Sequence, residues 1–367
     1  RLLLKGKLEG IGWFTYQTLE RIVRDHPEHE FIFFFDRQYD PSFVFAPNVT
    51  PVVVYPQARH PILFYLWFEW SIPFMLRKYK ADLFLSPDSY LSLSTKVPTC
   101  LVIHDLAFEH YPEHFVLSHR MYWRHYSPLF AKKAKRIATV SNFSKDDIVK
   151  HYGIDPANID VVYNGAHDEY VPLSAADREA VKQKYADGCE YFVFAGALHP
   201  RKNIVNLLKA FIEFKKRQHT NMKLVIAGRP AWKYDEVEEM KSEMPFKEEV
   251  KWVGYMNVDE LSKVIGGAYA LVYTSLFEGF GIPILEALQC DVPAIISNTS
   301  SMPEVAGEAA LQADPSDPMD IADKMHLIYR DEALRARLVD KARIQIKKFD
   351  WNISAKKLWD SIMKCVQ

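Results

Sequence analysis

The chain has 367 residues, of which 49% are hydrophobic and 25% charged, and its formal net charge is −1. This length predicts two domains of about 150–180 residues each, and the composition excludes a disordered chain. The balanced charge excludes wholesale nucleic-acid binding, which leaves a basic footprint. No apolar run reaches the roughly 18–20 residues that span a bilayer, and no signal peptide is visible.

Cysteine usage points to a reducing compartment. The sequence has no C-x-x-C pair, and its four cysteines are scattered: Cys100, Cys189, Cys290 and Cys365. Neither a disulfide framework nor a thiolate zinc site is therefore indicated. We expect a cytoplasmic protein.

Strand and helix patterns alternate along the whole chain. In the first half, strands are predicted at 31–35, 51–55, 82–85, 99–103 and 136–140, and helices near 12–26, 61–79, 119–133 and 142–152. In the second half, strands are predicted at 191–195, 222–227, 250–253, 269–273 and 293–296, and helices near 203–218, 258–266, 283–290, 318–329, 332–347 and 351–367. Alternation with continuous apolar strands predicts parallel sheets covered on both faces.

These patterns predict an α/β protein with two doubly wound domains, 1–168 and 169–350, joined by a hinge near 165–172. Ligands of doubly wound sheets bind beyond the carboxyl ends of the strands. With two such domains, we expect the site in the cleft between those ends. The informative residues should stand just after strands.

A glycine-bearing loop joins the predicted strand that ends at Tyr273 to a helix that begins near Pro283. Proline suits the first helical turn because its missing N–H costs nothing there. The backbone N–H groups of Phe280, Gly281 and Ile282 then point out of the helix start, where they can bind an anion or a polar ligand.

Two glutamates flank this helix start. Glu278 precedes it, and Glu286 lies about one turn inside, with its side chain leaning toward the N-terminus. The two carboxylates can bracket one ligand, one near its reactive end and the other near a diol, because carboxylates accept hydrogen bonds from paired hydroxyls. Two solvated glutamates on a surface loop are the alternative.

Two basic residues follow an earlier strand end. Gly196 provides the turn, Arg201 and Lys202 follow, and Asn203 is predicted to cap the next helix. The helix dipole disfavours cations at this position, and a bound diphosphate would reverse that penalty. The alternative is a pair of solvated basic residues.

The first domain offers two weaker signals. His104 ends a strand, where a neutral imidazole can hydrogen-bond a sugar hydroxyl or a phosphate. Gly10 and Gly12 open a helix and would allow a phosphate or sugar to approach the backbone. Thr15 stands where the dinucleotide fingerprint needs its third glycine, so that fingerprint is absent.

Several signatures are missing from the sequence. No Asp-x-Asp occurs, and we interpret no grouping of histidines and carboxylates as a metal cage, so no metal or other cofactor is expected. Neither a Gly-x4-Gly-Lys-[Ser/Thr] phosphate loop nor a Gly-x-Ser-x-Gly nucleophile elbow is present.

Residues 61–80 are rich in aromatics and end in Arg77, Lys78 and Lys80. An amphipathic helix that contacts a membrane has this composition, and so does a helix packed on a domain core. Glu69 and Pro73 interrupt the pattern, and core packing is the favoured interpretation.

The combination of motifs resembles the family 4 glycosyltransferases, from about residue 6 to the end of the chain. The resemblance rests on EGFGIPILEA with its Glu-x7-Glu spacing, on Arg201-Lys202-Asn203 after Gly196, on His104-Asp105-Leu106 and on Gly10-Ile11-Gly12. It implies the GT-B fold, two Rossmann-like domains that face each other, with the final helix packed back on the first domain. Family chains usually begin with a strand ahead of the glycine loop, and here only residues 1–4 correspond to it.

The resemblance also implies a role for each motif. Glu286 would hold the ribose diol, and Arg201 and Lys202 would neutralise the leaving diphosphate. Glu278 and the backbone of 280–282 would contact the donor sugar and phosphate. His104 would contact the sugar from the first domain, where Gly10 and Gly12 would let that domain close over the diphosphate.

The implied activity is metal-independent transfer of a hexose from a nucleotide-sugar, with retention of configuration, to a glycan or lipid-linked acceptor in cell-surface polysaccharide or lipopolysaccharide synthesis. The segments HDLAFEHYPEHF and GALHPRKN look most like those of mannosyltransferase members. GDP-mannose is therefore the first donor candidate, and a UDP-hexose is the second. A UDP-N-acetylglucosamine 2-epimerase and a non-catalytic sugar-binding protein are the alternatives. Peripheral contact with the inner face of the cytoplasmic membrane is also considered.

Overall fold

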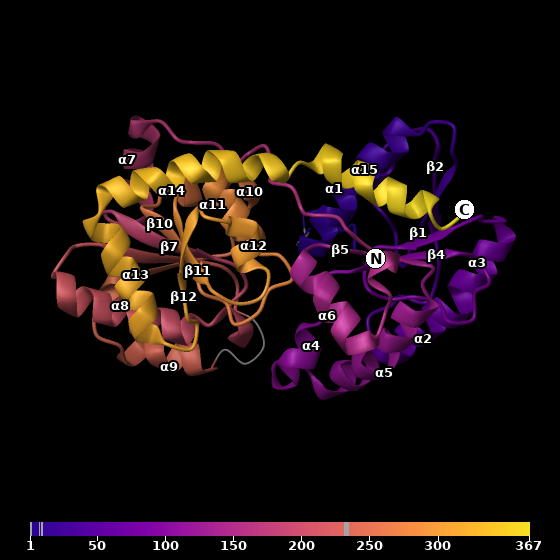
Figure 1. Cartoon of the computed structure of the whole chain (residues 1–367), viewed down its shortest axis with the longest axis horizontal. Helices are drawn as coiled ribbons and strands as arrows, with labels where there is room; N and C mark the ends of the chain where they lie inside the picture. The colour runs from indigo at the N-terminus through magenta and orange to yellow at the C-terminus, as the bar shows by residue number, and fades with distance from the viewer. Residues whose placement is uncertain (1, 7, 9, 231–234) are drawn as a thin grey trace. The chain divides into compact units, whose positions relative to one another are not determined.

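The computed structural model describes residues 2–6, 8, 10–230 and 235–367, and it divides into two compact units (Figure 1). Unit 1 comprises Arg1–Asn164 together with Asp350–Gln367, and unit 2 comprises Gly165–Phe349. The structure thus divides the chain after Asn164 and assigns the final helix to the first unit. Within the described residues, no helix is both long enough and apolar enough to cross a membrane.

Unit 1 has two parallel sheets, β1-β2 and β3-β4-β5-β6. Its strands are β1 (Phe31–Phe35), β2 (Val49–Val53), β3 (Phe84–Ser86), β4 (Thr99–Ile103), β5 (Arg136–Thr139) and β6 (Ile159–Val161). Its helices include α1 (Gly10–Asp25), α4 (Ala107–His110), α5 (Leu117–Lys133), α6 (Asn142–Tyr152) and α15 (Trp351–Met363). Every residue of β4 is buried, as expected for a parallel strand covered on both faces.

The final helix packs against unit 1. α15 lies beside α1 and contacts β5 and β6. The rings of Phe14 and Trp351 lie edge to face at 6.3 Å, and the Ser354 hydroxyl donates to the Tyr163 carbonyl at 2.6 Å. Aromatic packing and a partly buried hydrogen bond together hold this helix in place.

Unit 2 has one parallel sheet of order β12-β11-β10-β7-β8-β9. Its strands are β7 (Tyr191–Ala195), β8 (Lys223–Ala227), β9 (Val250–Gly254), β10 (Ala270–Tyr273), β11 (Ala294–Ser297) and β12 (Ala310–Ala313). Helices α8 (Ile204–Gln218), α9 (Asp235–Glu243) and α13 (Pro318–Arg330) pack together on one face (Figure 1). On the other face are α7 (Ala175–Tyr185), α10 (Val258–Gly266), α11 (Ile282–Gln289), α12 (Met302–Ala306) and α14 (Glu332–Gln345).

Most predicted elements form within two residues of their expected bounds, and the elements missed by sequence are short or polar. β6 has three residues, and β12 is an edge strand with a half-exposed pattern. α7, which lies in a polar stretch just after the predicted hinge, buries only Val181. Such segments lack the apolar periodicity on which the predictions depend.

Residues 61–78 form one continuous helical run, made of α2 (Pro61–Leu66), a π-helical turn η2 (Trp67–Ser71) and α3 (Ile72–Lys78). One face packs into the core of unit 1 through Phe64, Trp67, Phe68, Ile72 and Leu76, which confirms the favoured interpretation for that face. The opposite face leaves five large apolar side chains exposed, namely Ile62, Tyr65, Leu66, Trp70 and Phe74.

Candidate active site

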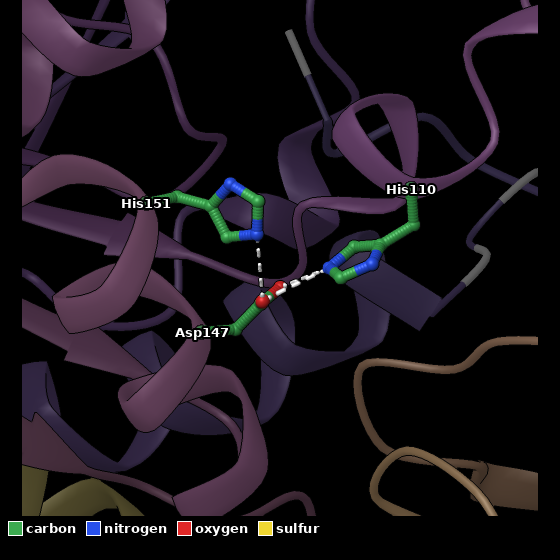
Figure 2. A group of neighbouring side chains, drawn as sticks. All are labelled: His110, Asp147 and His151. Atoms are coloured by element: carbon green, nitrogen blue, oxygen red, sulfur yellow. Dashed lines mark hydrogen bonds and ion pairs between the residues drawn. The ribbon is translucent and has the colours of Figure 1, made fainter.

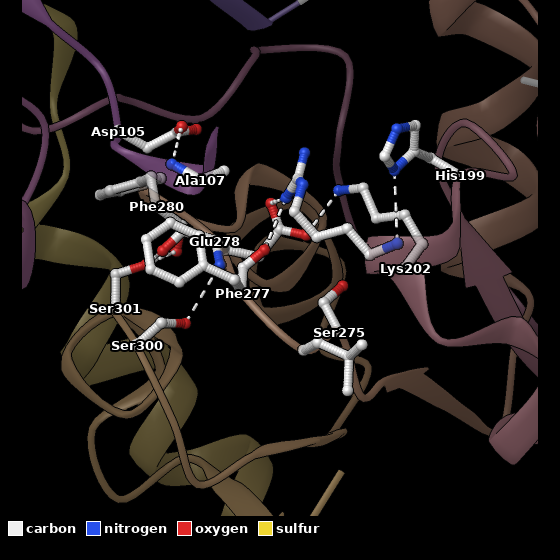
Figure 3. Close-up of polar contacts among 12 residues, drawn as sticks. Asp105, Ala107, His199, Lys202, Ser275, Phe277, Glu278, Phe280, Ser300 and Ser301 are labelled. Carbon is white, nitrogen blue, oxygen red and sulfur yellow. Dashed lines mark hydrogen bonds and ion pairs between the residues drawn. The ribbon is translucent and has the colours of Figure 1, made fainter. Parts of the chain in front are cut away.

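The loop between β10 and α11 is held in place by two serines. The Glu278 N–H donates to the Ser300 hydroxyl at 3.1 Å. The Ser301 hydroxyl contacts the carbonyls of Glu278 and Phe280 at 2.8 and 2.9 Å (Figure 3). Both serines follow β11, so the neighbouring strand end fixes the backbone that presents Glu278.

Glu278 forms ion pairs with both predicted cations. Its Oε2 lies 2.8 Å from Arg201 Nη1. Its Oε1 lies 2.6 Å from Lys202 Nζ (Figure 3). Lys202 Nζ also donates to the Tyr273 hydroxyl at 2.5 Å, and Arg201 Nη1 donates to the Phe277 carbonyl at 2.6 Å. Residues that follow the ends of β7 and β10 therefore meet in one largely buried cluster.

The charges of this cluster set the ionisation of its carboxylate. Burial alone raises the pKa of Glu278, but the positive charges of Arg201 and Lys202 outweigh burial and lower this pKa to about 2. Two cations and one anion leave the cluster with a net charge of +1. It can therefore attract a further anion even while Glu278 is ionised.

Glu286 lies in a different environment, about one turn inside α11. It is 7% exposed, the same fraction as Glu278. Burial raises the pKa of Glu286 to about 7, against the opposing effect of a hydrogen bond with the Tyr170 hydroxyl. A carboxyl group in such a site changes its charge near neutral pH and can accept hydrogen bonds from a diol when ionised.

The start of α11 has the geometry expected for an anion or polar ligand. Gly281 occupies the position before the helix with φ of +102°, a conformation that favours glycine, and Pro283 lies in the first turn. The helix begins at Ile282, so the backbone N–H groups around Gly281 and Ile282 lie at its positive end. Phe280 is buried against Phe349, with ring centroids 5.6 Å apart.

Gly196 follows β7 with φ of +146° and lies beside Lys202. A Cβ atom built on Gly228 would lie 1.8 Å from the Gly196 carbonyl oxygen, so a side chain at Gly228 would displace the Gly196 loop. The close approach of these two glycine turns positions the segment that carries Arg201 and Lys202.

The predicted cap by Asn203 is wrong. Asn203 precedes α8 in a left-handed conformation with φ of +61°, and its side chain makes no capping hydrogen bond. Its amide nitrogen donates instead to the carbonyls of Thr274 and Pro315, at 2.9 and 2.7 Å. The side chain thus ties this loop to the ends of β10 and β12, and these two hydrogen bonds orient the amide group away from a capping geometry.

In unit 1, His104 directly follows β4 and is buried. Its ring packs edge to face on Phe14 at 5.1 Å, and Nε2 lies 2.9 Å from the Pro87 carbonyl oxygen. Since a carbonyl only accepts, Nε2 carries the proton and Nδ1 is an acceptor. Burial lowers the pKa of His104, which favours the neutral ring that the sequence predicts.

Gly10 is the first residue of α1, as expected, and Gly12 is buried in its first turn. A Cβ atom on Gly12 would lie 3.2 Å from Leu8 Cδ2 and 3.3 Å from the Leu2 carbonyl oxygen. This contact gives Gly12 a packing reason besides the ligand approach predicted from sequence. Leu2–Leu4, which the family resemblance would place in a strand, form none.

The structure therefore brings Arg201, Lys202 and Glu278 into direct contact, and the sequence had placed them only around a common ligand. Sequence reasoning missed four side chains that complete the site: Tyr170, Tyr273, Ser300 and Ser301. Ser300 and Ser301 follow a predicted strand, and that strand-end position is the one signal that points to them.

Two protein families match the chain, one in each half. Glycosyltransferase Family 4 matches residues 8–170, and Glycosyl transferases group 1 matches residues 177–345. O-antigen chain mannosyltransferase B of Escherichia coli is 31% identical over 279 residues, which are 75% of this chain and 72% of that protein. O-antigen chain mannosyltransferase RfbU of Salmonella typhimurium is 28% identical over 277 residues, 75% of this chain and 73% of that protein.

Solved structures resemble the chain over nearly its whole length. WaaG, a glycosyltransferase involved in lipopolysaccharide biosynthesis, aligns with a TM-score of 0.73 at 16% identity, covering 97% of this chain and 96% of WaaG. Anabaena Alr3699/HepE, crystallised with UDP and glucose, aligns with a TM-score of 0.76 at 16% identity, covering 98% and 97%. At this level of identity the likeness concerns the fold.

Proposed function

This chain belongs to glycosyltransferase family 4, and on that premise we propose that it transfers mannose from GDP-mannose to a glycan or lipid-linked acceptor, with retention of configuration and without a metal ion. Its fold is GT-B, as predicted, and it is a glycosyltransferase of O-antigen or lipopolysaccharide synthesis. Mannose as the donor sugar is supported by the names of the two O-antigen relatives and by the HDLAFEHYPEHF and GALHPRKN segments.

The observation that carries the proposal is the Arg201–Lys202–Glu278 cluster. It is mostly buried, it retains a net charge of +1, and it lies beside the positive end of α11. A diphosphate placed there would meet two cations and the helix dipole at once, in a site that excludes most water. These are the conditions that stabilise a departing diphosphate.

In the proposed reaction, the bond between the anomeric carbon and the diphosphate oxygen breaks, and the electron pair leaves with the diphosphate. The acceptor hydroxyl attacks the oxocarbenium-like carbon from the same face, and its proton passes to a donor phosphate oxygen. Lys202 and Arg201 stabilise the charge that develops, at about 3–4 kcal/mol per well-placed donor. Glu286 would accept hydrogen bonds from the ribose diol, and His104, through Nδ1, from a sugar hydroxyl.

Thermal unfolding with GDP, UDP and ADP, each near 100 times its Kd, tests the donor assignment. A ligand that binds only the folded state adds about 2.7 kcal/mol at that concentration. We expect GDP to stabilise the protein and GDP-mannose to support transfer. Stabilisation by UDP alone would indicate a UDP-hexose donor in place of GDP-mannose. If no nucleotide stabilised the protein, the assignment of the donor site to this cluster would be wrong.

We further propose that the exposed face of residues 61–78 contacts the membrane surface that carries a lipid-linked acceptor. Trp70 and Phe74 are 69% and 60% exposed and line a shallow groove of about 460 Å³ together with Tyr55 and Arg77. Exposed aromatics beside cations are typical of helices that lie in a lipid interface.

Sedimentation with vesicles of phosphatidylethanolamine and phosphatidylglycerol measures this contact. The double substitution Trp70→Gln/Phe74→Gln should reduce the bound fraction at least tenfold, because it removes two apolar side chains from the interface. Ile344→Gln, which changes an equally exposed apolar residue of unit 2, is the matched control. Equal binding by both variants would contradict the proposed surface.

A further inference from the structure

Three potential metal ligands of unit 1 converge outside the candidate active site. Asp147 and His151 lie one turn apart on α6, and His110 ends α4. His110 Nε2 lies 2.9 Å from both Asp147 oxygens, and His151 Nε2 lies 3.3 Å from Asp147 Oδ1. Figure 2 shows both imidazole rings turned toward the one carboxylate.

Two of the three spacings between the ligand atoms approach those around a tetrahedral ion. One ligand atom from each residue lies within 4.8 Å of the other two. Ligands about 2.0–2.2 Å from a tetrahedral zinc are separated by roughly 3.3–3.6 Å. The nitrogen–oxygen distances of 2.9 and 3.3 Å are therefore within a few tenths of an ångström of the coordinated arrangement.

The burial of the three side chains leaves one side of the group open. The Asp147 side chain is 6% exposed, whereas His110 and His151 are 29% and 31% exposed. The carboxylate supplies the negative charge from the buried side of the group, and the two imidazoles lie at the solvent-exposed side. An ion could enter from that side and keep a water molecule as its fourth ligand.

We propose that His110, Asp147 and His151 bind one zinc ion. Two imidazole nitrogens and one carboxylate suit zinc or a similar transition metal, whereas magnesium and calcium require mostly oxygen ligands. This site would cross-link α4 to α6, and α4 begins three residues after His104. The ion would thus anchor the segment that follows His104 and take no direct part in glycosyl transfer.

The sequence did not predict this group. His110 stands four residues before His114, a spacing that suits a metal when both lie on one helix. The structure separates them instead: α4 ends at His110, and His114 lies in the following 3-10 turn, 3.7 Å from Glu113. The partner of His110 comes from α6, 37 residues away in the chain.

Zinc titration of the metal-stripped chain, in competition with a chromophoric chelator, tests the proposal. We expect one equivalent of zinc bound with micromolar or tighter Kd. His110→Gln and His151→Gln should each weaken that binding at least tenfold, since each removes one of three ligands. His125→Gln, which changes an exposed histidine on α5, should bind as tightly as the unchanged protein.

His151→Gln is the decisive variant, because its side chain is partly exposed and its loss leaves the carboxylate paired with His110. The metal-free variant should unfold at nearly the temperature of the metal-free parent protein, and zinc should raise the unfolding temperature of the parent alone. The proposed site would be wrong if the parent protein bound no zinc. It would also be wrong if both histidine variants bound zinc as tightly as the parent. Calcium or magnesium binding in place of zinc would overturn the assignment of the ion.

Discussion

Glu278 and Glu286 are the same residue type, lie eight positions apart and are equally buried, yet their carboxyl groups have opposite electrostatics. The pKa of Glu278 is lowered to about 2, and the pKa of Glu286 is raised to about 7. Burial acts on both in the same direction. The difference comes from Arg201 and Lys202, which contact only the first of them.

This contrast separates two tasks within one site. The Glu278 region is a permanently charged cluster whose two cations can serve a diphosphate at any physiological pH. The Glu286 region contains one carboxyl group with a tyrosine partner, and its charge depends on pH and on the ligand. We therefore expect the first region to govern the chemical step and the second to govern nucleotide binding.

The largest expected effect is that of Lys202→Ala. In the proposed mechanism this cation stabilises the departing diphosphate, so its loss should lower kcat at saturating donor about 100-fold or more. Steady-state transfer assays with GDP-mannose measure it. Lys209→Ala, on the exposed side of α8, should leave kcat unchanged. A near-normal kcat for Lys202→Ala would assign the chemical step to other residues.

Glu286→Gln should act on binding instead. A neutral amide is a weaker acceptor for the ribose diol than a carboxylate, so the nucleotide Kd should rise about 10- to 100-fold. Isothermal titration with GDP at pH 8 measures this rise. Because the pKa of Glu286 is about 7, the ratio of the two Kd values should shrink as the pH falls from 8 to 6.

Glu239→Gln, which changes an exposed glutamate on α9, is the control for that titration and should show neither effect. The comparison between the two glutamates fails if Glu286→Gln lowers kcat as strongly as Lys202→Ala while leaving Kd unchanged. It also fails if the ratio of Kd values does not depend on pH.

The residues that make this contrast differ in how far the sequence predicts them. Arg201, Lys202 and Glu278 stand just after strands, and Glu286 lies about one turn inside the helix that follows. The rule that ligands bind at the carboxyl ends of parallel strands selects this region. The alternation of apolar strand runs with helical patterns predicts the two α/β domains, because buried parallel strands appear in a sequence as continuous apolar runs.

Other features depend on contacts between segments that are distant in the chain. The pairing of Glu278 with Arg201 joins residues 77 positions apart, and Tyr170 reaches Glu286 from the start of unit 2. The Asn203 side chain likewise makes two tertiary hydrogen bonds, to the carbonyls of Thr274 and Pro315, and does not form the predicted helix cap. No local sequence pattern predicts these contacts, because the tertiary fold determines which distant side chains and carbonyls come within reach.

The smallest expected effect, on stability, has opposite signs for the two carboxyl groups. The folded pKa of Glu286 lies above its ordinary value of 4.5, so the folded state binds more protons and Glu286 lowers stability as the pH rises from about 4.5 to 7. The folded pKa of Glu278 lies below 4.5, so its contribution is present above that pH and is lost as the pH falls toward 2. Urea unfolding between pH 3 and 7.5 tests both signs. The stability of Glu286→Gln relative to the parent should rise by about 1 kcal/mol between pH 6 and 7. The loss of stability of Glu278→Gln relative to the parent should instead become smaller as the pH falls from 5 to 3. Parallel plots of stability against pH for both variants would contradict the assigned charge environments.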